Sequence, residues 1–404
     1  MKKFFVIGIP DSPDFHFAKE VEELLSTARI FSGGRRHHEL VSEQLPVDAQ
    51  WIDITVPLDD VFRQYSAVES PIVVFASGDP LFFGFANTIR RKMPDAEIIV
   101  YPWFNSLQTL AHRMVIPYHD MRIVSLTGRD WPEFDRALIE RADKIGLLTD
   151  RQHSPSAIAQ RMIEYGYTQY QMTIGEHLGN REKEKVRTIS LSEAAHDTSE
   201  YPNCLILQAS SPLPPRRLGI PDHEFMLLDG RSKMITKMPI RLLSLQALDL
   251  YQRHEMWDIG FCTGSVSVEA RLQFPHLHIT SFEIRQEGRA LMQENCHRFG
   301  APGIEVHIGD FMQEDLSVLK APDAVFIGGH GGHLRDMIHR IYKYLRPGGC
   351  IVMNAVISQV VPVDSRAIFE TTATELGMTL QSAERIQLDE FNPIIILKAI
   401  KQEL

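Results

Sequence analysis

The chain has 404 residues, of which 44% are hydrophobic and 23% charged, and its formal net charge is −10. This length exceeds one ordinary hydrophobic core and predicts two domains of about 200 residues each. The acidic balance argues against a nucleic-acid binder with a broad basic surface, and no apolar run reaches the ~18 residues that a membrane span requires. The four cysteines are far apart and form no C-x-x-C pair, which argues against a disulfide framework and favours a cytoplasmic protein.

Short apolar, β-branched runs alternate with amphipathic stretches in the first half of the chain. This alternation is typical of α/β domains with mainly parallel sheets. We expect strands at 4–9, 72–76, 98–101, 123–126, 144–148, 170–174 and 204–207. Helices are expected at 18–28, 83–92 and 156–165.

The periodicity stops at a segment rich in proline. Pro212, Pro214 and Pro215 can join neither a helix interior nor a central strand. We therefore expect a linker at about 209–219 between a first domain, 1–210, and a second domain, 211–404.

The second half begins a new alternation of helices and strands. Helices are expected at 237–251, 266–273, 287–299, 334–345 and 366–376. Strands are expected at 255–259, 278–283, 304–308, 324–328 and 350–354. Two final apolar stretches, 380–388 and 394–398, are expected to be joined by a hairpin connection at 389–393.

A glycine loop follows the strand 255–259 and opens the next helix. Gly260 and Gly264 allow a tight turn and close approach to a ligand. Glu283 ends the next strand, where a carboxylate can accept hydrogen bonds from ribose hydroxyls, and Asp310 follows the third strand, where it could face an adenine. The alternative is a plain strand–turn–helix junction, but acidic residues at successive strand ends favour a nucleotide-type site.

The composition of this loop indicates which nucleotide is bound. A dinucleotide loop normally carries three glycines, whereas Cys262 holds the middle position here and no third glycine follows. S-Adenosylmethionine has no pyrophosphate and tolerates a looser loop, and the expected hairpin after the last helix suits a class I methyltransferase. The sequence thus predicts S-adenosylmethionine as the cofactor.

Four segments of the second half carry a family resemblance. Residues 220–225, 234–237, 258–264 and 327–333 resemble the CbiT-type decarboxylating precorrin C15-methyltransferases, although that family usually has glycine in place of Cys262 and a small hydroxyl residue in place of His330. With the strand-end positions above, the resemblance implies that the cofactor is bound by Thr236, Asp258, Gly260, Thr263, Gly264, Glu283, Asp310, Gly328 and Gly329.

The segment 76–84 of the first half predicts another strand-to-helix turn. Gly78 permits the turn, Asp79 can cap the helix and Pro80 suits its first turn, so a structural role alone is one interpretation. Together with residues 32–37, 105–108, 124–129 and 148–159, however, the segment resembles the CbiE-type precorrin C5-methyltransferases. This resemblance implies the tetrapyrrole methylase (class III) fold, two α/β lobes with the cofactor between them, and cofactor contacts at Gly78, Asp79, Pro80, Ser106 and Thr149.

The first loop departs from this family. The family usually has a G-x-G-P-G-type loop after the first strand, whereas residues 8–13 here retain only Gly8. Nearby, Arg35 and Arg36 could pair with substrate carboxylates or form a solvated surface pair. The same alternatives apply to Lys237 and its basic neighbours Arg231, Lys233 and Arg241, of which Lys237 is the candidate for substrate binding.

Nearly the whole chain resembles the fused precorrin-6Y C5,15-methyltransferases (decarboxylating) of the CobL or CbiET type. The resemblance implies methylation of precorrin-6B, or its cobalt form, at C5 by the first domain. It implies C15 methylation and loss of carbon dioxide from the ring C acetate by the second, giving precorrin-8 in cobalamin biosynthesis. Relatives also imply a homo-oligomer. Methyl transfer of this kind depends on alignment of the reactants, which explains why no Ser-His-Asp set is present.

The two histidines near residue 330 admit more than one interpretation. His330 and His333 lie beside glycines, but no acidic or cysteine partner is near in sequence, so no metal is expected. We expect His330 to face the substrate and help hold the ring C acetate, and His333 to be solvated at a helix start.

Two other functions remain open. One is an RNA methyltransferase whose first domain is a targeting module. The other is a protein in which one or both domains bind the cofactor or tetrapyrrole without turnover.

Overall fold

The computed structural model describes residues 2–12, 15–68, 71–356, 364–381, 384–388 and 393–403. Contacts divide the chain into two compact units. The first contains Met1–Asp130, Ala142–Gln160 and Gln169–Pro212, and the second contains Trp131–Arg141, Arg161–Thr168 and Leu213–Leu404. The domain limits 1–210 and 211–404 stay a prediction; two short segments of the first of these ranges pack with the second unit.

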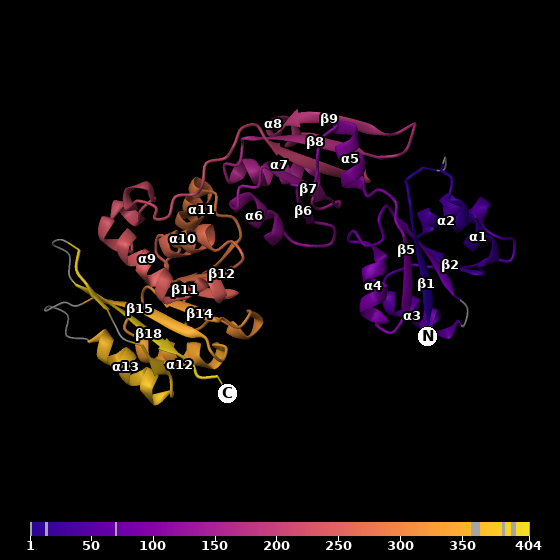
Figure 1. Ribbon diagram of the computed structural model, residues 1–404. Coiled ribbons are helices and arrows are strands. Elements are labelled where there is room, and N and C mark those ends of the chain that lie inside the picture. The colour runs from indigo at the N-terminus through magenta and orange to yellow at the C-terminus, as the bar shows by residue number, and fades with distance from the viewer. Residues whose placement is uncertain are drawn as a thin grey trace. The chain divides into compact units, whose positions relative to one another are not determined.

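A five-stranded parallel sheet forms the first lobe of the first unit (Figure 1). Its strands, in the order β3-β2-β4-β1-β5, are β1 (Lys3–Ile9), β2 (Ile30–Gly33), β3 (Gln50–Asp53), β4 (Ile72–Ser77) and β5 (Glu97–Tyr101). The helices of this lobe are α1 (Lys19–Thr27), α2 (Arg35–Val41), α3 (Leu58–Ala67) and α4 (Phe85–Lys92). Because side chains alternate along a strand, Phe4 and Val6 pack with α3 and α4, while Ile7 and Ile9 pack with α1 and α2.

The second lobe contains a mixed sheet. Its strands, in the order β6-β7-β10-β8-β9, are β6 (Arg122–Ser125), β7 (Lys144–Leu148), β8 (Tyr170–Glu176), β9 (Lys185–Ser190) and β10 (Asn203–Ala209). Only β6 and β7 pair in parallel, so this sheet differs from the mainly parallel arrangement expected. The short connection from β8 to β9 allows only chain reversal, because a parallel crossover needs a dozen or more residues. The helices of this part of the chain are α5 (Ser106–Met114), α6 (Pro132–Ile139), α7 (Pro155–Glu164) and α8 (Leu191–Ala194).

The second unit is built on one large sheet with the strand order β13-β12-β11-β14-β15-β18-β16. Its strands are β11 (Glu255–Ile259), β12 (His278–Glu283), β13 (Ile304–Ile308), β14 (Ala324–Ile327), β15 (Cys350–Val356), β16 (Thr379–Leu380), β17 (Glu384–Ile386) and β18 (Ile394–Ile400). The strands β11 to β15 are parallel, and β18 runs antiparallel to β15, β16 and β17. This is the strand order of a class I methyltransferase. Most of the expected hairpin connection, residues 389–392, lies outside the described residues.

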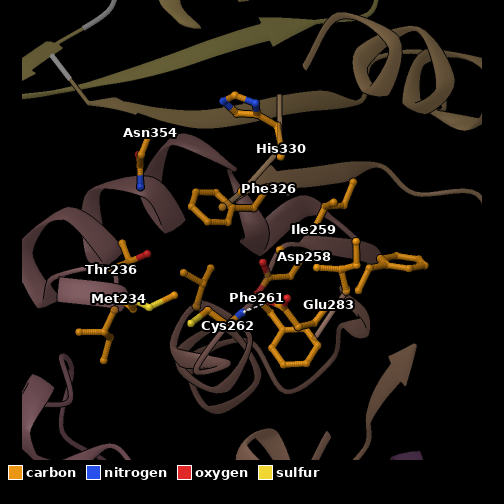
Figure 2. Close-up of a pocket in the computed structure, with 18 of the residues that line it drawn as sticks. Met234, Thr236, Asp258, Ile259, Phe261, Cys262, Glu283, Phe326, His330 and Asn354 are labelled. Carbon is orange, nitrogen blue, oxygen red and sulfur yellow. Dashed lines mark hydrogen bonds between the residues drawn. The ribbon is translucent and has the colours of Figure 1, made fainter. Parts of the chain in front are cut away.

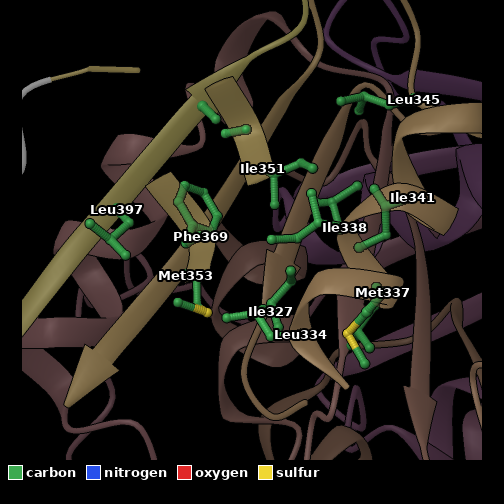
Figure 3. Packing of buried hydrophobic residues seen from close by; sticks show 14 of the residues in the cluster. Ile327, Leu334, Met337, Ile338, Ile341, Leu345, Ile351, Met353, Phe369 and Leu397 are labelled. Carbon is green, nitrogen blue, oxygen red and sulfur yellow. The ribbon is translucent and has the colours of Figure 1, made fainter. Parts of the chain in front are cut away.

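Helices cover both faces of this sheet. They are α9 (Met238–Ala247), α10 (Ser265–Gln273), α11 (Glu287–Phe299), α12 (Leu334–Tyr344) and α13 (Ser365–Glu375). Ile327 and Ile351 of the sheet meet Ile338 of α12 and Phe369 of α13 on one face (Figure 3). On the other face, sheet residues such as Met256 pack against α9 and α10. The parallel strands are thereby buried on both sides, and their carboxyl ends are left to form a ligand site.

Residues from before and after the proline-rich segment pack together within the second unit. The Tyr167 hydroxyl donates a hydrogen bond to the Gly300 carbonyl at 2.7 Å, and Arg216 Nη2 donates to the Tyr167 hydroxyl at 2.6 Å. Arg161 also pairs with the buried carboxylate of Asp135 at 2.7 Å. None of the helices in the described ranges combines the length and the hydropathy needed for a membrane span.

Candidate active site

A cavity of about 810 Å³, called the second cavity after the unit that contains it, lies at the carboxyl ends of the parallel strands in the second unit (Figure 2). Its volume falls within the range of about 300–1,000 Å³ that is usual for small-molecule sites. Among the residues predicted from the sequence, it is lined by Thr236, Lys237, Asp258, Gly260, Glu283, Asp310, Gly328, Gly329 and His330. The other two, Thr263 and Gly264, are buried in the loop beside the cavity and do not line it.

Two glycine loops approach each other at the base of this cavity. Gly260 has a φ of 73°, and a Cβ on it would lie 2.7 Å from the backbone nitrogen of Gly329. A Cβ on Gly328 would in turn lie 2.9 Å from the Gly260 carbonyl oxygen. Only residues without a Cβ allow the loops after β11 and β14 to come this close.

Cys262 occupies a backbone conformation that favours glycine. Its φ is 51°, and the residue lines the cavity. The side chain is half-buried, and burial raises the pKa of the thiol, so it is mainly protonated near neutral pH. A neutral thiol thus lines the cavity at a position where the resemblance led us to expect glycine.

Glu283 anchors the glycine loop from the end of β12. Its Oε2 accepts a hydrogen bond from the Cys262 amide at 2.8 Å, and its Oε1 accepts one from Arg285 Nη1 at 3.0 Å. A carboxylate has about four lone-pair sites, so this side chain can still accept hydrogen bonds from a ligand. The residue is buried but lines the cavity, as a ribose-binding carboxylate would.

Asp258 carries an acceptor that has no partner in the described part of the chain. Its Oδ2 accepts a hydrogen bond from Ser267 Oγ at 2.5 Å, whereas its Oδ1 is buried without a hydrogen bond. Burial raises the pKa of Asp258 to about 7, opposed by the Ser267 hydrogen bond and assisted by the nearby charge of Glu283. Buried polar atoms are normally satisfied, so a donor of a bound ligand would reach this oxygen only after a small shift of the atoms that cover it.

His330 lies on the β14 side of the cavity. Its Nδ1 accepts a hydrogen bond from the Gly332 amide at 3.2 Å, so the proton is on Nε2, which lies 3.3 Å from Ser365 Oγ. Burial, followed by the charge of His333, lowers the pKa of His330 and keeps the ring neutral at pH 7. His333 is exposed at the start of α12, and within the described ranges no three His, Cys, Asp or Glu side chains are grouped to hold a metal ion.

The basic cluster before and within α9 separates into different environments. Lys237 lines the cavity, and its Nζ lies 3.6 Å from Asp222 Oδ2. Arg241 is fully buried, with Nε 3.3 Å from Glu269 Oε2 and Nη1 donating to the Thr236 carbonyl at 2.8 Å. Arg241 therefore holds the segment that presents Thr236 to the cavity. Arg231 is exposed and pairs with Asp229, and Lys233 lines the cavity from an exposed position.

The first cavity, of about 610 Å³, lies in the first unit. Of the predicted residues it is lined by Gly78, Ser106, Thr149 and Arg36, and not by Asp79, Pro80 or Arg35. Gly78 has a φ of 62°, and the Thr149 hydroxyl lies 2.6 Å from Asn203 Oδ1. Asp79 Oδ1 accepts from the Leu81 amide at 2.8 Å, so it closes a turn, and α4 begins only at Phe85.

The two adjacent arginines of the first unit differ in their partners. Arg35 is exposed and pairs with Glu39 at 3.2 Å on the same helix. Arg36 lines the cavity and forms an ion pair with Asp11, a residue of the altered first loop. The other oxygen of Asp11, Oδ2, is buried without a hydrogen-bond partner among the described residues. An acidic residue thus lies in the loop that the resemblance led us to expect to be rich in glycine, beside the arginine expected to meet substrate.

One polar residue of the second cavity escaped the sequence analysis. Asn354 lies on β15 and lines the same cavity as His330 and Thr236 (Figure 2). The sequence feature that could have identified it is a single amide residue in the otherwise apolar run Cys350–Val356, near the carboxyl end of a parallel strand. Such a residue is costly to bury and has a reason to face a ligand.

Known proteins resemble the chain over both units. Residues 229–403 match a family model described as a precorrin methyltransferase domain. Precorrin-6Y C(5,15)-methyltransferase (decarboxylating) from Sinorhizobium sp is 30% identical over 391 residues, which cover 96% of this chain and 91% of the relative. Cobalt-precorrin-6B C(15)-methyltransferase (decarboxylating) from Salmonella typhimurium is 37% identical over 134 residues, which cover 33% of this chain and 68% of that protein. Among solved structures, precorrin-6Y C5,15-methyltransferase from Geobacter metallireducens GS-15 is 30% identical at a TM-score of 0.41, over 46% of this chain and 98% of that one.

Proposed function

Because the chain belongs to the family of precorrin-6Y C5,15-methyltransferases (decarboxylating), we propose that it methylates C5 and C15 of a precorrin and removes carbon dioxide from the ring C acetate. The first unit performs the C5 methylation. The second unit performs the C15 methylation and the decarboxylation. The substrate is precorrin-6B or its cobalt form.

The observation that carries this proposal is that Glu283, Asp310 and the two close glycine loops line one cavity at the strand ends of the second unit. These two carboxylates and the close glycine loops fit a nucleoside with a cationic methionine portion. Glu283 would hold the ribose hydroxyls, Asp310 would face the adenine, and Asp258 would accept from a donor of the ligand. Gly260, Gly328 and Gly329 would form the wall, with Thr263 and Gly264 shaping the loop.

S-Adenosylmethionine, when bound, supplies an electrophilic methyl group on a sulfonium. The chain's own residues then have to hold the tetrapyrrole so that the accepting carbon faces that methyl group. Alignment of two reactants can contribute about 7–11 kcal/mol to lowering a barrier. Thr236 and Lys237 face the cavity from the α9 side and would contribute to this alignment.

For the decarboxylation, His330 would help hold the ring C acetate. Its neutral ring has the proton on Nε2 and can donate to a carboxylate oxygen. When the carbon–carbon bond breaks, its electron pair enters the conjugated macrocycle, so no metal is required for this step. The expected readout is loss of decarboxylation and C15 methylation in His330→Ala, and unchanged rates would contradict this role.

In the first unit, Gly78, Ser106 and Thr149 would bind the cofactor from the wall of the cavity, with Asp79 and Pro80 shaping the adjacent turn. Arg36 would meet a substrate carboxylate after exchanging its partner Asp11, while Arg35 lies outside the cavity. The protein is proposed to act in the cytoplasm as a homo-oligomer. The four free cysteines, none of them in a disulfide, support a reducing compartment.

Mass spectrometry of the tetrapyrrole after incubation with the full chain and S-adenosylmethionine tests the function. Two added methyl groups with loss of one carbon dioxide are expected from the cobalt-bound or the metal-free substrate. One methyl group with loss of carbon dioxide would restrict activity to the second unit. No mass change with either substrate would refute the function and favour an RNA methyltransferase, to be tested by salt-dependent RNA binding.

A matched pair of variants connects the outcome to the second cavity. Glu283→Gln should abolish C15 methylation and retain C5 methylation, because only the second unit loses its ribose-binding carboxylate. Glu287→Gln, on the exposed start of α11 outside the cavity, should retain both. Equal loss of both methylations in Glu283→Gln would contradict the division of activities between the units.

A further inference from the structure

An amide side chain faces the part of the second cavity that the cofactor residues leave open. Apart from Thr236, which precedes α9, the proposed cofactor residues lie at or just after the ends of β11, β12, β13 and β14, whereas Asn354 lies on β15, farther along the sheet. The register pairs Val356 with Ile394, and Ile394 with Ile386, and all three residues line the cavity. Asn354 is therefore a polar group at an apolar wall, where a largely apolar macrocycle can lie.

The orientation of this amide is set by a serine on α9. Ser244 is fully buried, and its Oγ lies 2.8 Å from the Ile240 carbonyl and 3.0 Å from Asn354 Oδ1. The hydroxyl has one proton, which these two acceptors share in a three-centre hydrogen bond. With Oδ1 turned toward Ser244, the amide nitrogen points into the cavity, as Figure 2 shows.

The amide nitrogen has two protons and, in the part of the chain that the structure describes, no acceptor for them. The residue is only half-buried, so water can satisfy these protons until a ligand replaces it. Two cationic side chains, Lys233 and Lys237, line the same cavity. A ligand group that accepts hydrogen bonds and carries negative charge suits this combination.

We propose that Asn354 binds a carboxylate on the periphery of the tetrapyrrole substrate through its amide nitrogen, and that Ser244 is the positioning residue that fixes the amide. This inference rests on the proposed function of the second unit. The carboxylate bound is one that the substrate keeps. His330 is proposed to hold the acetate that leaves, so Asn354 is left to bind another peripheral carboxylate.

Steady-state kinetics of the full chain test the inference. Asn354→Ala should raise the KM for the tetrapyrrole in C15 methylation about 10- to 100-fold with little change in kcat, because a hydrogen bond to a charged group is lost equally in the ground and transition states. The C5 methylation catalysed by the first unit of the same molecules is an internal control and should not change. Binding of S-adenosylmethionine, measured by calorimetry, should also stay the same.

The variant Asn354→Asp distinguishes a donor from an acceptor. The aspartate keeps the bond from Ser244 but presents an oxygen to the cavity, so the KM should rise more than in Asn354→Ala. An aspartate variant that binds the substrate as well as the native enzyme would overturn the inference, because it would mean that the amide oxygen accepts a proton from the ligand.

Two further measurements separate positioning from folding and from the proposed function. Ser244→Ala should raise the KM less than Asn354→Ala, and the double variant should be no worse than Asn354→Ala alone, because the two residues act as one unit. Additive effects would overturn the positioning role. Tetrapyrrole binding to each variant, followed by absorbance without S-adenosylmethionine, tests the contact even if the native enzyme proved inactive at C15, a result that would refute only the proposed function.

Discussion

Removal of the buried guanidinium of Arg241 should destabilise the second unit severely. The side chains of Arg241 and Glu269 are both fully buried, with Arg241 Nε 3.3 Å from Glu269 Oε2. In Arg241→Met, Glu269 still accepts hydrogen bonds from the amides of Gly219 and Ile220, each at 3.0 Å, but loses the positive charge of its partner. Leaving one partner of a buried ion pair uncompensated costs about 3–5 kcal/mol. At about 2–4 °C per kcal/mol for a domain of this size, the melting temperature of the second unit should fall by about 6–20 °C.

Hydrogen exchange measures this loss where it occurs. Amides of β11 and α10 should lose protection in Arg241→Met, while those of β1 and β4 in the first unit should not. The double variant Arg241→Met, Glu269→Gln should recover part of the loss, since no unpaired charge stays buried. Arg366→Met, which removes an exposed pair with Glu370, is the matched control and should have no measurable effect. A double variant as unstable as the single one would refute the electrostatic reasoning.

Three further predictions concern the loops of the second cavity. Burial raises the pKa of Asp258 to about 7, so the folded protein keeps a proton that the unfolded chain loses near pH 4. The free energy of unfolding of the second unit should therefore fall, relative to that of Asp258→Asn, as pH rises from about 4 to about 7. Parallel denaturation profiles of the two proteins over this range would contradict the assignment. Cys262→Gly should relieve the positive φ and stabilise the unit by up to about 1 kcal/mol, whereas Cys262→Ala, which keeps the Cβ, should not; equal melting temperatures of the two variants would argue against backbone strain. Gly260→Ala should lower both stability and S-adenosylmethionine affinity, because its Cβ would lie 2.7 Å from the Gly329 nitrogen. Gly329→Ala is the control and should have the melting temperature of the native protein, because its Cβ would meet no atom closer than 4.0 Å.

Much of the second unit was predictable from the sequence. The bounds expected for β11, β12, β13 and α11 agree with the structure because each is a regular apolar pattern with clear turn residues on both sides. In the first unit, β2 and β3 were missed because each contains only two apolar residues, Ile30 and Phe31 in β2 and Trp51 and Ile52 in β3. The strand β9 was missed because it is a largely exposed edge strand, whose two apolar residues, Val186 and Ile189, do not alternate regularly with polar ones.

The candidate sites, too, were predictable only in part. The residues predicted at strand ends, such as Glu283 and Asp310, do line one cavity, because the ends of parallel strands meet at one edge of the sheet. The partners of the charged residues were not predictable. The pairing of Arg36 with Asp11 and the burial of Arg241 depend on contacts between segments far apart in the chain, which a linear pattern does not encode.

The second unit contains chain segments from both sides of the proline-rich linker, and this determines how the protein responds to cleavage of the linker. A protease that cut once near Pro214 would produce two fragments, yet Tyr167 on the first would still be bonded to Gly300 on the second, and helix α6 would still be seated in its place. The nicked molecule should therefore migrate as one species under native conditions and as two pieces only in denaturant. A gene split at the same codon would encode halves that recognise each other, since each retains part of a shared hydrophobic interior.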